Sequence, residues 1–273
     1  MSDAGAQTDG EAAASDDPDR GDGPIDNLTA IIDTDILETT IEIVDTVDRE
    51  SVMRFGQGGL DVLLIDSATA YSTELHLDAD AFDAIGAGRF PAGLNHQALL
   101  DYIGTAGNSQ LAELSFQAET ARLAIQIEPH NRGFALINPD SIRDPPDIPD
   151  LEFPNRFEIA GDTLQEAVDV AELVSDHLKI HGALDDECIH VIADGDTDTT
   201  TTTLEDELEF ADVQKDAETI LSMEFLQEAV GVIPSSATVE IQFGDEHPVT
   251  LDWSYADGHG DVHQMIAPRI RAR

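Results

Sequence analysis

The stretches ILETTIEIVDTV (residues 36–47) and TLQEAVDVAELVS (residues 163–175) decide the fold, because they are two copies of one amphipathic helix. In both stretches apolar residues recur at the spacing of a single helix face. Leu37 aligns with Leu164 when the sequence is shifted by 127 residues, and further apolar pairs align at the same shift. One helix can match another by chance, so this match needs independent support.

The same shift superposes a second pair of helical stretches, Asn95–Ala106 and Ser222–Ile233, and then aligns Phe116 with Phe243 in the strand that follows. A single shift that holds across two helices and a strand indicates an internal duplication. Runs that alternate apolar and polar residues between the helices predict half-buried strands. The expected helix N-caps are Asp35, Asn95, Asp162 and Ser222. The sequence therefore predicts an α+β fold made of two copies of one domain.

Composition marks the domain boundaries. Residues 1–27 contain eight acids, one Arg and almost nothing large and apolar, so we expect a disordered acidic tail. The two domains are expected at 28–128 and 153–273. Residues 129–152 between them are rich in Pro, which cannot donate to a β ladder, and they predict an extended connecting loop.

The chain is strongly acidic: its 273 residues include 13 Lys and Arg against 57 Asp and Glu, a net charge of −44. Such a surface either faces a basic partner or forms a solvated coat suited to a salt-rich cytoplasm. We favour the coat of a halophilic protein, because the acids are spread over the whole length. In molar salt the Debye length is only ~3 Å, so repulsion between the acidic side chains is screened. In dilute buffer this screening is lost, and we expect the protein to loosen or unfold.

Location and redox state are also suggested by the sequence. The single Cys188 excludes an intramolecular disulfide and fits a reducing cytoplasm, where we expect the protein to be located. No apolar stretch approaches the ~18 residues needed to cross a membrane. We expect no membrane partner.

Motifs for catalysis and metal binding are weak. Asp194, Asp196, Asp198 and Glu205 imitate a calcium loop, but Thr199 stands where that loop needs Gly. The pair His259 and His263 has a metal-site spacing without a third ligand, and we expect both residues in a surface turn of a Gly-rich hairpin. The sequence has no phosphate-binding loop of Walker type and no G-x-S-x-G elbow. We therefore expect no metal, no cofactor and no enzymatic activity.

Several motifs carry a resemblance to a known family. The run ALINPDSIRDPPDIPDL (135–151) resembles the interdomain connecting loop of archaeal proliferating cell nuclear antigen (PCNA), the DNA sliding clamp. The run QMIAPRI (264–270) is similar to that family's C-terminal strand and tail, and VSDHLKI (174–180) and ADGDTD (193–198) resemble its haloarchaeal members. The resemblance covers residues 28–273.

The resemblance implies a processivity factor made of two DNA-clamp domains per subunit. Three subunits would close head to tail into a homotrimeric ring, with helices lining the inside and antiparallel sheets outside. The ring would encircle double-stranded DNA and tether DNA polymerase, ligase, nuclease and clamp-loader client peptides during replication and repair.

The resemblance also implies two sets of site residues. By position, the client-peptide pocket would be lined by Ile65, Ala70, Ile148, Pro248, Met265, Ala267, Pro268 and Ile270. The subunits would join by edge-strand pairing between Arg122–Glu128 of one and Cys188–Ala193 of the next. The residues assigned to this interface are Arg122, Leu123, Ala124, Ile125, Cys188, Ile189, His190 and Val191.

One feature departs from the expected clamp. The helical stretches contain no Lys or Arg, and their channel-facing residues would be Glu38, Glu42, Asp101, Glu166, Asp169, Glu224 and Glu228. An acidic wall repels a polyanion, whereas a clamp is expected to attract phosphates. Three explanations stay open: salt cations bridge wall and DNA, more basic sister subunits complete a mixed ring, or the chain is a diverged clamp-like scaffold or regulatory subunit without productive DNA encirclement.

Overall fold

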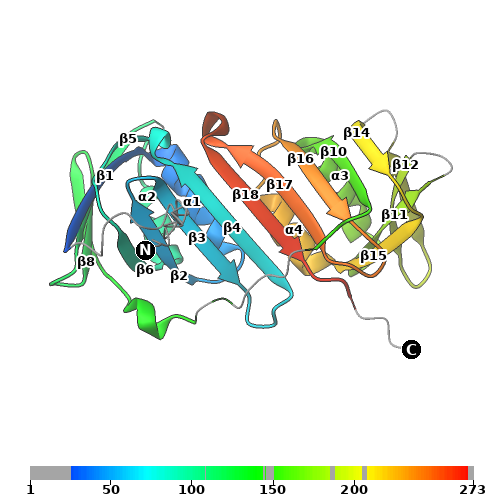
Figure 1. Ribbon diagram of the computed structural model, residues 1–273, viewed down its shortest axis with the longest axis horizontal. Coiled ribbons are helices and arrows are strands. Elements are labelled where there is room, and N and C mark those ends of the chain that lie inside the picture. Colours follow the sequence, from blue (N-terminus) through cyan, green and yellow to red (C-terminus); the bar gives the residue numbers. More distant parts are fainter. Residues whose placement is uncertain are drawn as a thin grey trace, which may run out of the picture.

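The computed structural model describes residues 26–107, 109–143, 145, 151–184, 188–204 and 208–269. Within them the order of elements occurs twice: a strand, a helix, five strands, a helix and three strands (Figure 1). The first half comprises β1 (Asn27–Asp33), α1 (Thr34–Asp45), β2 (Glu50–Gly56), β3 (Gly59–Ile65), β4 (Tyr71–Asp78), β5 (Phe82–Ile85), β6 (Phe90–Asn95), α2 (His96–Ile103), β7 (Leu111–Gln117), β8 (Arg122–Ile127) and β9 (His130–Ala135). The second half comprises β10 (Asn155–Ala160), α3 (Gly161–Glu172), β11 (His177–Ala183), β12 (Cys188–Asp194), β13 (Thr199–Leu204), β14 (Leu208–Val213), β15 (Ala217–Ser222), α4 (Met223–Gly231), β16 (Thr238–Phe243), β17 (Val249–Tyr255) and β18 (Gly260–Ile266). The predicted duplication is therefore visible in the order of elements.

The strands form three antiparallel sheets. A nine-stranded sheet has the order β14-β10-β16-β17-β18-β4-β3-β2-β6, and it crosses from one half to the other where β18 pairs with β4. A five-stranded sheet in the first half has the order β5-β1-β7-β8-β9, and a four-stranded sheet in the second has the order β13-β12-β11-β15. The pairing of β4 with β18 is the in-chain joint, and it makes one continuous layer of the two halves.

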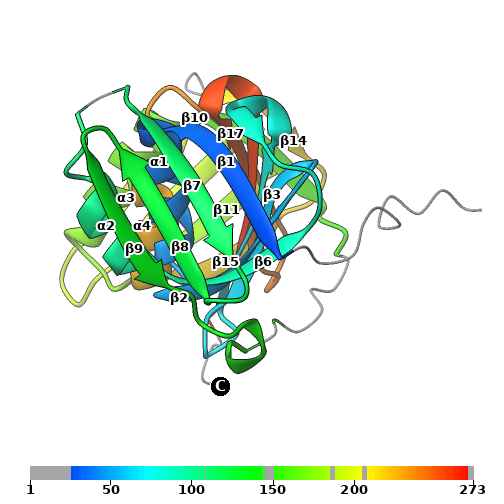
Figure 2. The ribbon, with the colours of Figure 1, turned by 90° about the vertical axis from the view of Figure 1, so that its left-hand side faces the viewer.

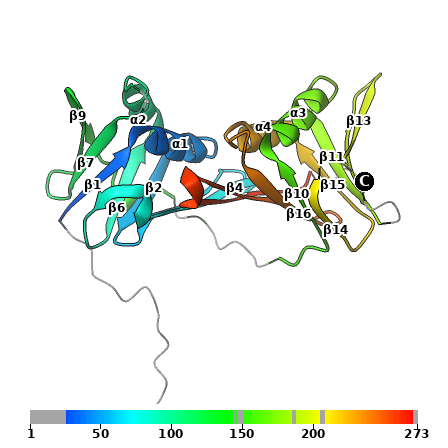
Figure 3. The ribbon, with the colours of Figure 1, turned by 90° about the horizontal axis from the view of Figure 1, so that it is seen from above.

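The helices lie on the opposite side from this layer. Figure 3 shows α1, α2, α3 and α4 along one face of the molecule, with the nine-stranded sheet along the other. The helices are held there by burial: Leu37 and Ile41 of α1 and Leu164 and Val168 of α3 are all buried. Burying each such aliphatic side chain stabilises the fold by about 1.5–3 kcal/mol. No helix among the described residues is long and apolar enough to span a bilayer.

The helix starts agree only partly with the predicted caps. Asn95 caps α2 as predicted, since its side chain accepts a hydrogen bond from the Ala98 backbone N–H at 3.1 Å. The prediction of Asp35 as a cap is wrong, because Asp33 caps α1 through the Asp35 N–H at 2.8 Å. The prediction of Asp162 is also wrong, because this residue lies in the first turn of α3. Ser222 does hold the N-cap position of α4, although its side chain makes no capping hydrogen bond.

The edges of the sheets differ from the prediction. Strand β8 pairs with β7 on one side and β9 on the other, and β12 is likewise enclosed by β11 and β13. The prediction that Arg122–Glu128 and Cys188–Ala193 are free edges is therefore wrong. Among the described strands, the ends of the three sheets are β5 and β9, β14 and β6, and β13 and β15, and Figure 2 shows β9 at the rim of the five-stranded sheet. The edge strands that lie next to the predicted ones are therefore β9 and β13.

The connecting loop is shorter than the sequence indicates. His130–Ala135 belongs to the sheet of the first half, so only the part after Ala135 links the halves. That part docks first on β6, where the Ile137 N–H donates to the Gly93 carbonyl at 2.8 Å. Residues 144 and 146–150 of the predicted loop and most of the predicted acidic tail (residues 1–25) lie outside the described residues.

Candidate functional site

The predicted pocket residues come from neighbouring strands of the nine-stranded sheet. Ile65 at the end of β3 lies opposite Ser72 of β4, and Ser72 lies opposite Met265 of β18. Met265 in turn faces Thr250 of β17. Residues directly opposite one another in an antiparallel ladder project from the same face of the sheet. Ile65 and Met265 are therefore on one face, and both are half-buried.

This face is the outer one, away from the helices. The alternate residues of β3 and β18, such as Leu64 and Ile266, are buried in the core on the helix side. Beyond the strands, the Ala267 N–H donates to the Ala70 carbonyl at 2.8 Å and continues the ladder. The remaining described residues of the predicted pocket, Pro248 and Pro268, are also half-buried. Ile148 and Ile270 lie outside the described residues.

One residue that the sequence did not single out shapes this end of the sheet. Asp66 closes the turn between β3 and β4, where its Oδ1 accepts hydrogen bonds from the N–H groups of Ala70 at 2.6 Å and Tyr71 at 2.9 Å. Its Oδ2 accepts from the Ala68 N–H at 2.9 Å. The turn needs this support because Thr69 has a φ of 56°, in the left-handed region. The sequence does contain a signal for this role, because an Asp at the start of a turn commonly hydrogen-bonds to the backbone of that turn.

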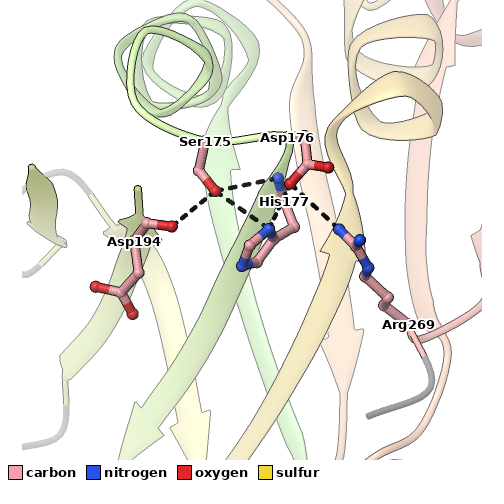
Figure 4. Close-up of polar contacts among 5 residues, drawn as sticks. All are labelled: Ser175, Asp176, His177, Asp194 and Arg269. Carbon is pink, nitrogen blue, oxygen red and sulfur yellow. Dashed lines mark hydrogen bonds and ion pairs between the residues drawn. The ribbon is translucent and has the colours of Figure 1, made fainter. Parts of the chain in front are cut away.

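The segment after β18 bridges the two halves of the chain. Ala267 is bonded to Ala70 in the first half, and the Arg269 N–H donates to the Ile220 carbonyl of β15 at 2.7 Å in the second. The Arg269 guanidinium also donates to Asp176 at 3.3 Å, as Figure 4 shows. A hydrogen bond with His177 at 2.7 Å and the nearby Arg269 charge lower the pKa of the Asp176 carboxyl. The segment after β18 is thus anchored by polar contacts that the sequence did not reveal.

The predicted channel residues form an acidic face on the helices. The described parts of α1, α2, α3 and α4 contain no Lys or Arg. Six of the seven predicted carboxylates are exposed, namely Glu42, Asp101, Glu166, Asp169, Glu224 and Glu228, and Glu38 is half-buried. Partial burial, together with Glu38 one turn away, raises the pKa of Glu42. The exposed face of the helices is therefore acidic, and that this face lines a channel stays a prediction.

The outer face of the same sheet also contains a groove of about 550 Å³ beside the in-chain joint. Its lining includes Glu74, His76, Asp252, Asp261 and His263. His263 bonds to Asp252 at 2.6 Å, and this contact raises the pKa of the His263 imidazole. The prediction that His263 sits in a surface turn is wrong, because the residue belongs to β18. Among the described residues, no group of three or more potential ligands is arranged to hold a metal ion.

The contact between Ser51 and His96 has the residue types of a catalytic pair, but it is buried. Ser51 and His96 are hydrogen-bonded at 2.7 Å, and Asp45 lies 3.6 Å from the other ring nitrogen. Both Ser51 and His96 are fully buried, so no substrate reaches the hydroxyl group. Burial lowers the pKa of His96, which keeps the ring neutral. The contact fastens the start of β2 to the start of α2 and is structural.

Comparison with known proteins agrees with this architecture. No protein-family model matches the chain. The DNA polymerase sliding clamp of Halobacterium salinarum is 36% identical over 244 residues, which cover 89% of this chain and 98% of that protein. The DNA polymerase sliding clamp of Haloarcula marismortui is 35% identical over 245 residues, covering 90% and 99%.

Solved structures share the fold. The PCNA of A. fulgidus, solved with the C-terminal region of FEN-1, superposes with a TM-score of 0.84 at 24% identity and covers 90% of this chain and 100% of its own. The PCNA of Thermococcus kodakaraensis gives a TM-score of 0.79 at 20% identity, covering 89% and 100%. The duplicated α+β halves, the shared outer sheet and the identity to the haloarchaeal proteins together establish that the chain belongs to the DNA polymerase sliding clamp family.

Proposed function

We propose that the chain is a subunit of a ring that encircles double-stranded DNA and tethers replication and repair enzymes to it. The in-chain joint is the observation that carries the proposal. There, β4 and β18 combine four strands of the first half with five of the second. The sheets left over are a five-stranded one ending at β9 and a four-stranded one ending at β13. Each copy therefore offers an edge that complements the other edge of a neighbour, and a closed trimer repeats the joint around the ring.

The outer face around Ile65 and Met265 is proposed as the docking site for client peptides. Its half-buried apolar side chains lie together at the strand ends, and the anchored segment after β18 borders them. Two or three apolar or aromatic anchors at about 1.5–3 kcal/mol each support micromolar docking after the cost of association. The clients would be DNA polymerase, ligase, nuclease and the ATP-driven clamp loader. The clamp itself would tether and not catalyse.

The acidic helix face is the reason to consider two alternatives to a simple homotrimeric ring on DNA. A wall of exposed carboxylates repels phosphates, so DNA affinity contributes little. A closed ring needs no such affinity, because a topological link retains it on circular DNA. The alternatives are a mixed ring with more basic sister subunits and a clamp-like scaffold that binds clients without enclosing DNA.

Retention on DNA tests the proposal. The protein is loaded onto a nicked circular plasmid with its clamp loader in molar salt, and bound protein is measured by gel filtration before and after linearisation. A clamp is retained on the circle and released when the DNA is cut. Client-peptide binding without retention would support the scaffold, and retention only with a sister subunit would support the mixed ring.

A further inference from the structure

The in-chain joint carries two reciprocal pairs of polar residues on its outer face. His76 of β4 lies directly opposite Asp261 of β18. Glu74 of β4 lies directly opposite His263 of β18. Each pair therefore places an imidazole on one half of the chain and a carboxylate on the other. Because cross-strand pairs of opposite charge stabilise a ladder, the contribution of both pairs depends on protonation of the imidazoles.

Each imidazole is also held by carboxylates of its own half. The two ring nitrogens of His76 lie 2.6 Å from Asp61 of β3 and 3.1 Å from Asp78 at the end of β4. The Nδ1 atom of His263 lies 2.6 Å from Asp252 of β17. An ionised carboxylate only accepts hydrogen bonds, so both nitrogens of His76 donate, as they do in the protonated ring. The geometry around His76 thus fits an imidazolium.

These two rings supply the positive charge of the joint. Strands β3, β4, β17 and β18 are described over their full length and contain no Lys or Arg. Fixed cations of the same sheet lie farther out, where Arg54 of β2 is opposite Asp61 and Arg156 of β10 pairs with Glu240 of β16 at 3.2 Å. The other titratable groups around the joint are Glu158 and Glu240 on the side of β17, and Asp257 and His259 in the turn before β18.

The contacts of both rings favour the protonated form. The hydrogen bond with Asp252 raises the pKa of His263, and the charge of Glu74 across the joint adds to this effect. Partial burial opposes protonation of His76, but the hydrogen bonds with its two carboxylates outweigh it and raise the pKa of this ring. A folded pKa above the unfolded value of about 6.5 gives stabilisation that is complete below that pH and is lost as the pH rises through the folded pKa.

We infer that the in-chain joint is a proton-sensitive contact between the two halves of the chain. With His76 and His263 protonated, the two reciprocal pairs hold β4 against β18. With both rings neutral, the surrounding carboxylates repel one another without a cation between them, and the joint loosens. The groove that both rings line is open to solvent, so the rings exchange protons without unfolding. The inference concerns a single chain and does not depend on the proposed ring.

Hydrogen exchange of the joint tests the inference. The full chain is kept in molar salt, where partly buried pairs are screened less than exposed ones. Exchange of peptides that cover β4 and β18 is measured on both sides of the histidine range, from about pH 5.5 to about pH 8.5, and corrected for the intrinsic pH dependence of exchange. We expect the corrected protection to fall about two- to fivefold as the pH rises, which is the contribution of opposite-charge pairs in a ladder.

Two substitutions at one position separate charge from shape. His263→Gln removes the titratable cation and should give low protection at every pH. His263→Lys keeps a cation that stays protonated over the whole range and should give high protection at every pH. The matched control is His259→Gln, because this residue contacts β4 through its backbone carbonyl, which accepts from the Asp78 N–H at 2.8 Å. The control should keep the pH response of the unmodified chain.

Each outcome decides for or against the joint. A pH response that survives in both His263 variants would refute the inference, and so would its loss in His259→Gln. An equal fall in protection at β8 and β12, which lie in the other two sheets, would show a general effect of net charge and would also overturn it. None of these results bears on retention of the protein on circular DNA, so the proposed ring is tested separately.

Discussion

Replacement of Asp66 probes how the proposed client-binding face is held in shape. Two of its three hydrogen bonds end on the partly buried N–H groups of Ala70 and Tyr71, and the third ends on the exposed Ala68. Hydrogen bonds to a charged acceptor contribute about 1.5–3 kcal/mol each when they are shielded, and less when water replaces them. We therefore expect Asp66→Ala to lower the free energy of unfolding by about 2–4 kcal/mol.

Asp66→Asn gives a graded comparison. The amide keeps one carbonyl oxygen, which can still accept from Ala70 and Tyr71, but it loses the charge and the Oδ2 contact with Ala68. The expected loss is about 1 kcal/mol. Urea unfolding in molar salt, followed by circular dichroism, measures both values. Urea is chosen because an ionic denaturant would itself screen the charges.

The pocket itself should respond in parallel. Because Asp66 fixes Ala70, to which Ala267 is bonded, Asp66→Ala should weaken binding of a client peptide about tenfold, or about 1.4 kcal/mol. Asp83→Ala is the control, since it also removes a negative charge, but from an exposed position on β5 away from Ala70 and Ala267. Unchanged stability and peptide affinity in Asp66→Ala, or equal effects in the control, would refute the assigned role.

Three further predictions concern conditions and anchors. Burial lowers the pKa of His96 in the folded chain below the unfolded value of about 6.5. As the pH falls, the unfolded chain therefore takes up the proton first, and the free energy of unfolding should decrease below about pH 6.5. His96→Gln should flatten that part of the stability profile, and an unaltered slope in urea titrations would contradict the assignment. Arg269→Gln should speed amide exchange at Ala267 and Arg269 while leaving overall stability almost unchanged, because the Asp176 partner is exposed. Arg156→Gln, which breaks a partly exposed pair with Glu240, is the control and should not affect those two amides. Transfer from molar to millimolar salt should unfold the protein, since 57 acids face only 13 cations, and a circular dichroism spectrum that is constant over this range would argue against it.

The duplication could be predicted from the sequence because it is recorded in apolar spacing. Buried helix positions such as Leu37 and Leu164 are restricted to apolar residues. The constant shift can therefore still be detected although the exposed positions of the two halves differ. The acidic inner face was predicted for a related reason, since charge on an exposed helix face follows directly from residue type. Both features depend on local composition and a period.

The free edges could not be found in the same way. A strand enclosed on both sides and a strand at an edge have the same alternation, so β8 was mistaken for an edge. Strand β9 has only one buried residue, Phe134, and β13 is almost entirely Thr, so neither has the apolar pattern of a strand. Which backbone groups stay unpaired is decided by tertiary topology and not by local pattern. The contacts of Asp66 and Arg269 cannot be predicted from the sequence, because a single polar side chain gives no repeating apolar pattern that would reveal its partner.

The in-chain joint has a consequence for how the protein is made. Gln264 of β18 donates to the Tyr71 hydroxyl across 193 residues of sequence, and β4 stays unpaired on that side until β18 arrives. During translation the amino-terminal half therefore leaves the ribosome with an unpaired flank on β4. Polysomes that hold many such halves close together risk premature cross-pairing, and a chaperone that shields β4 would matter most before residue 260 is added.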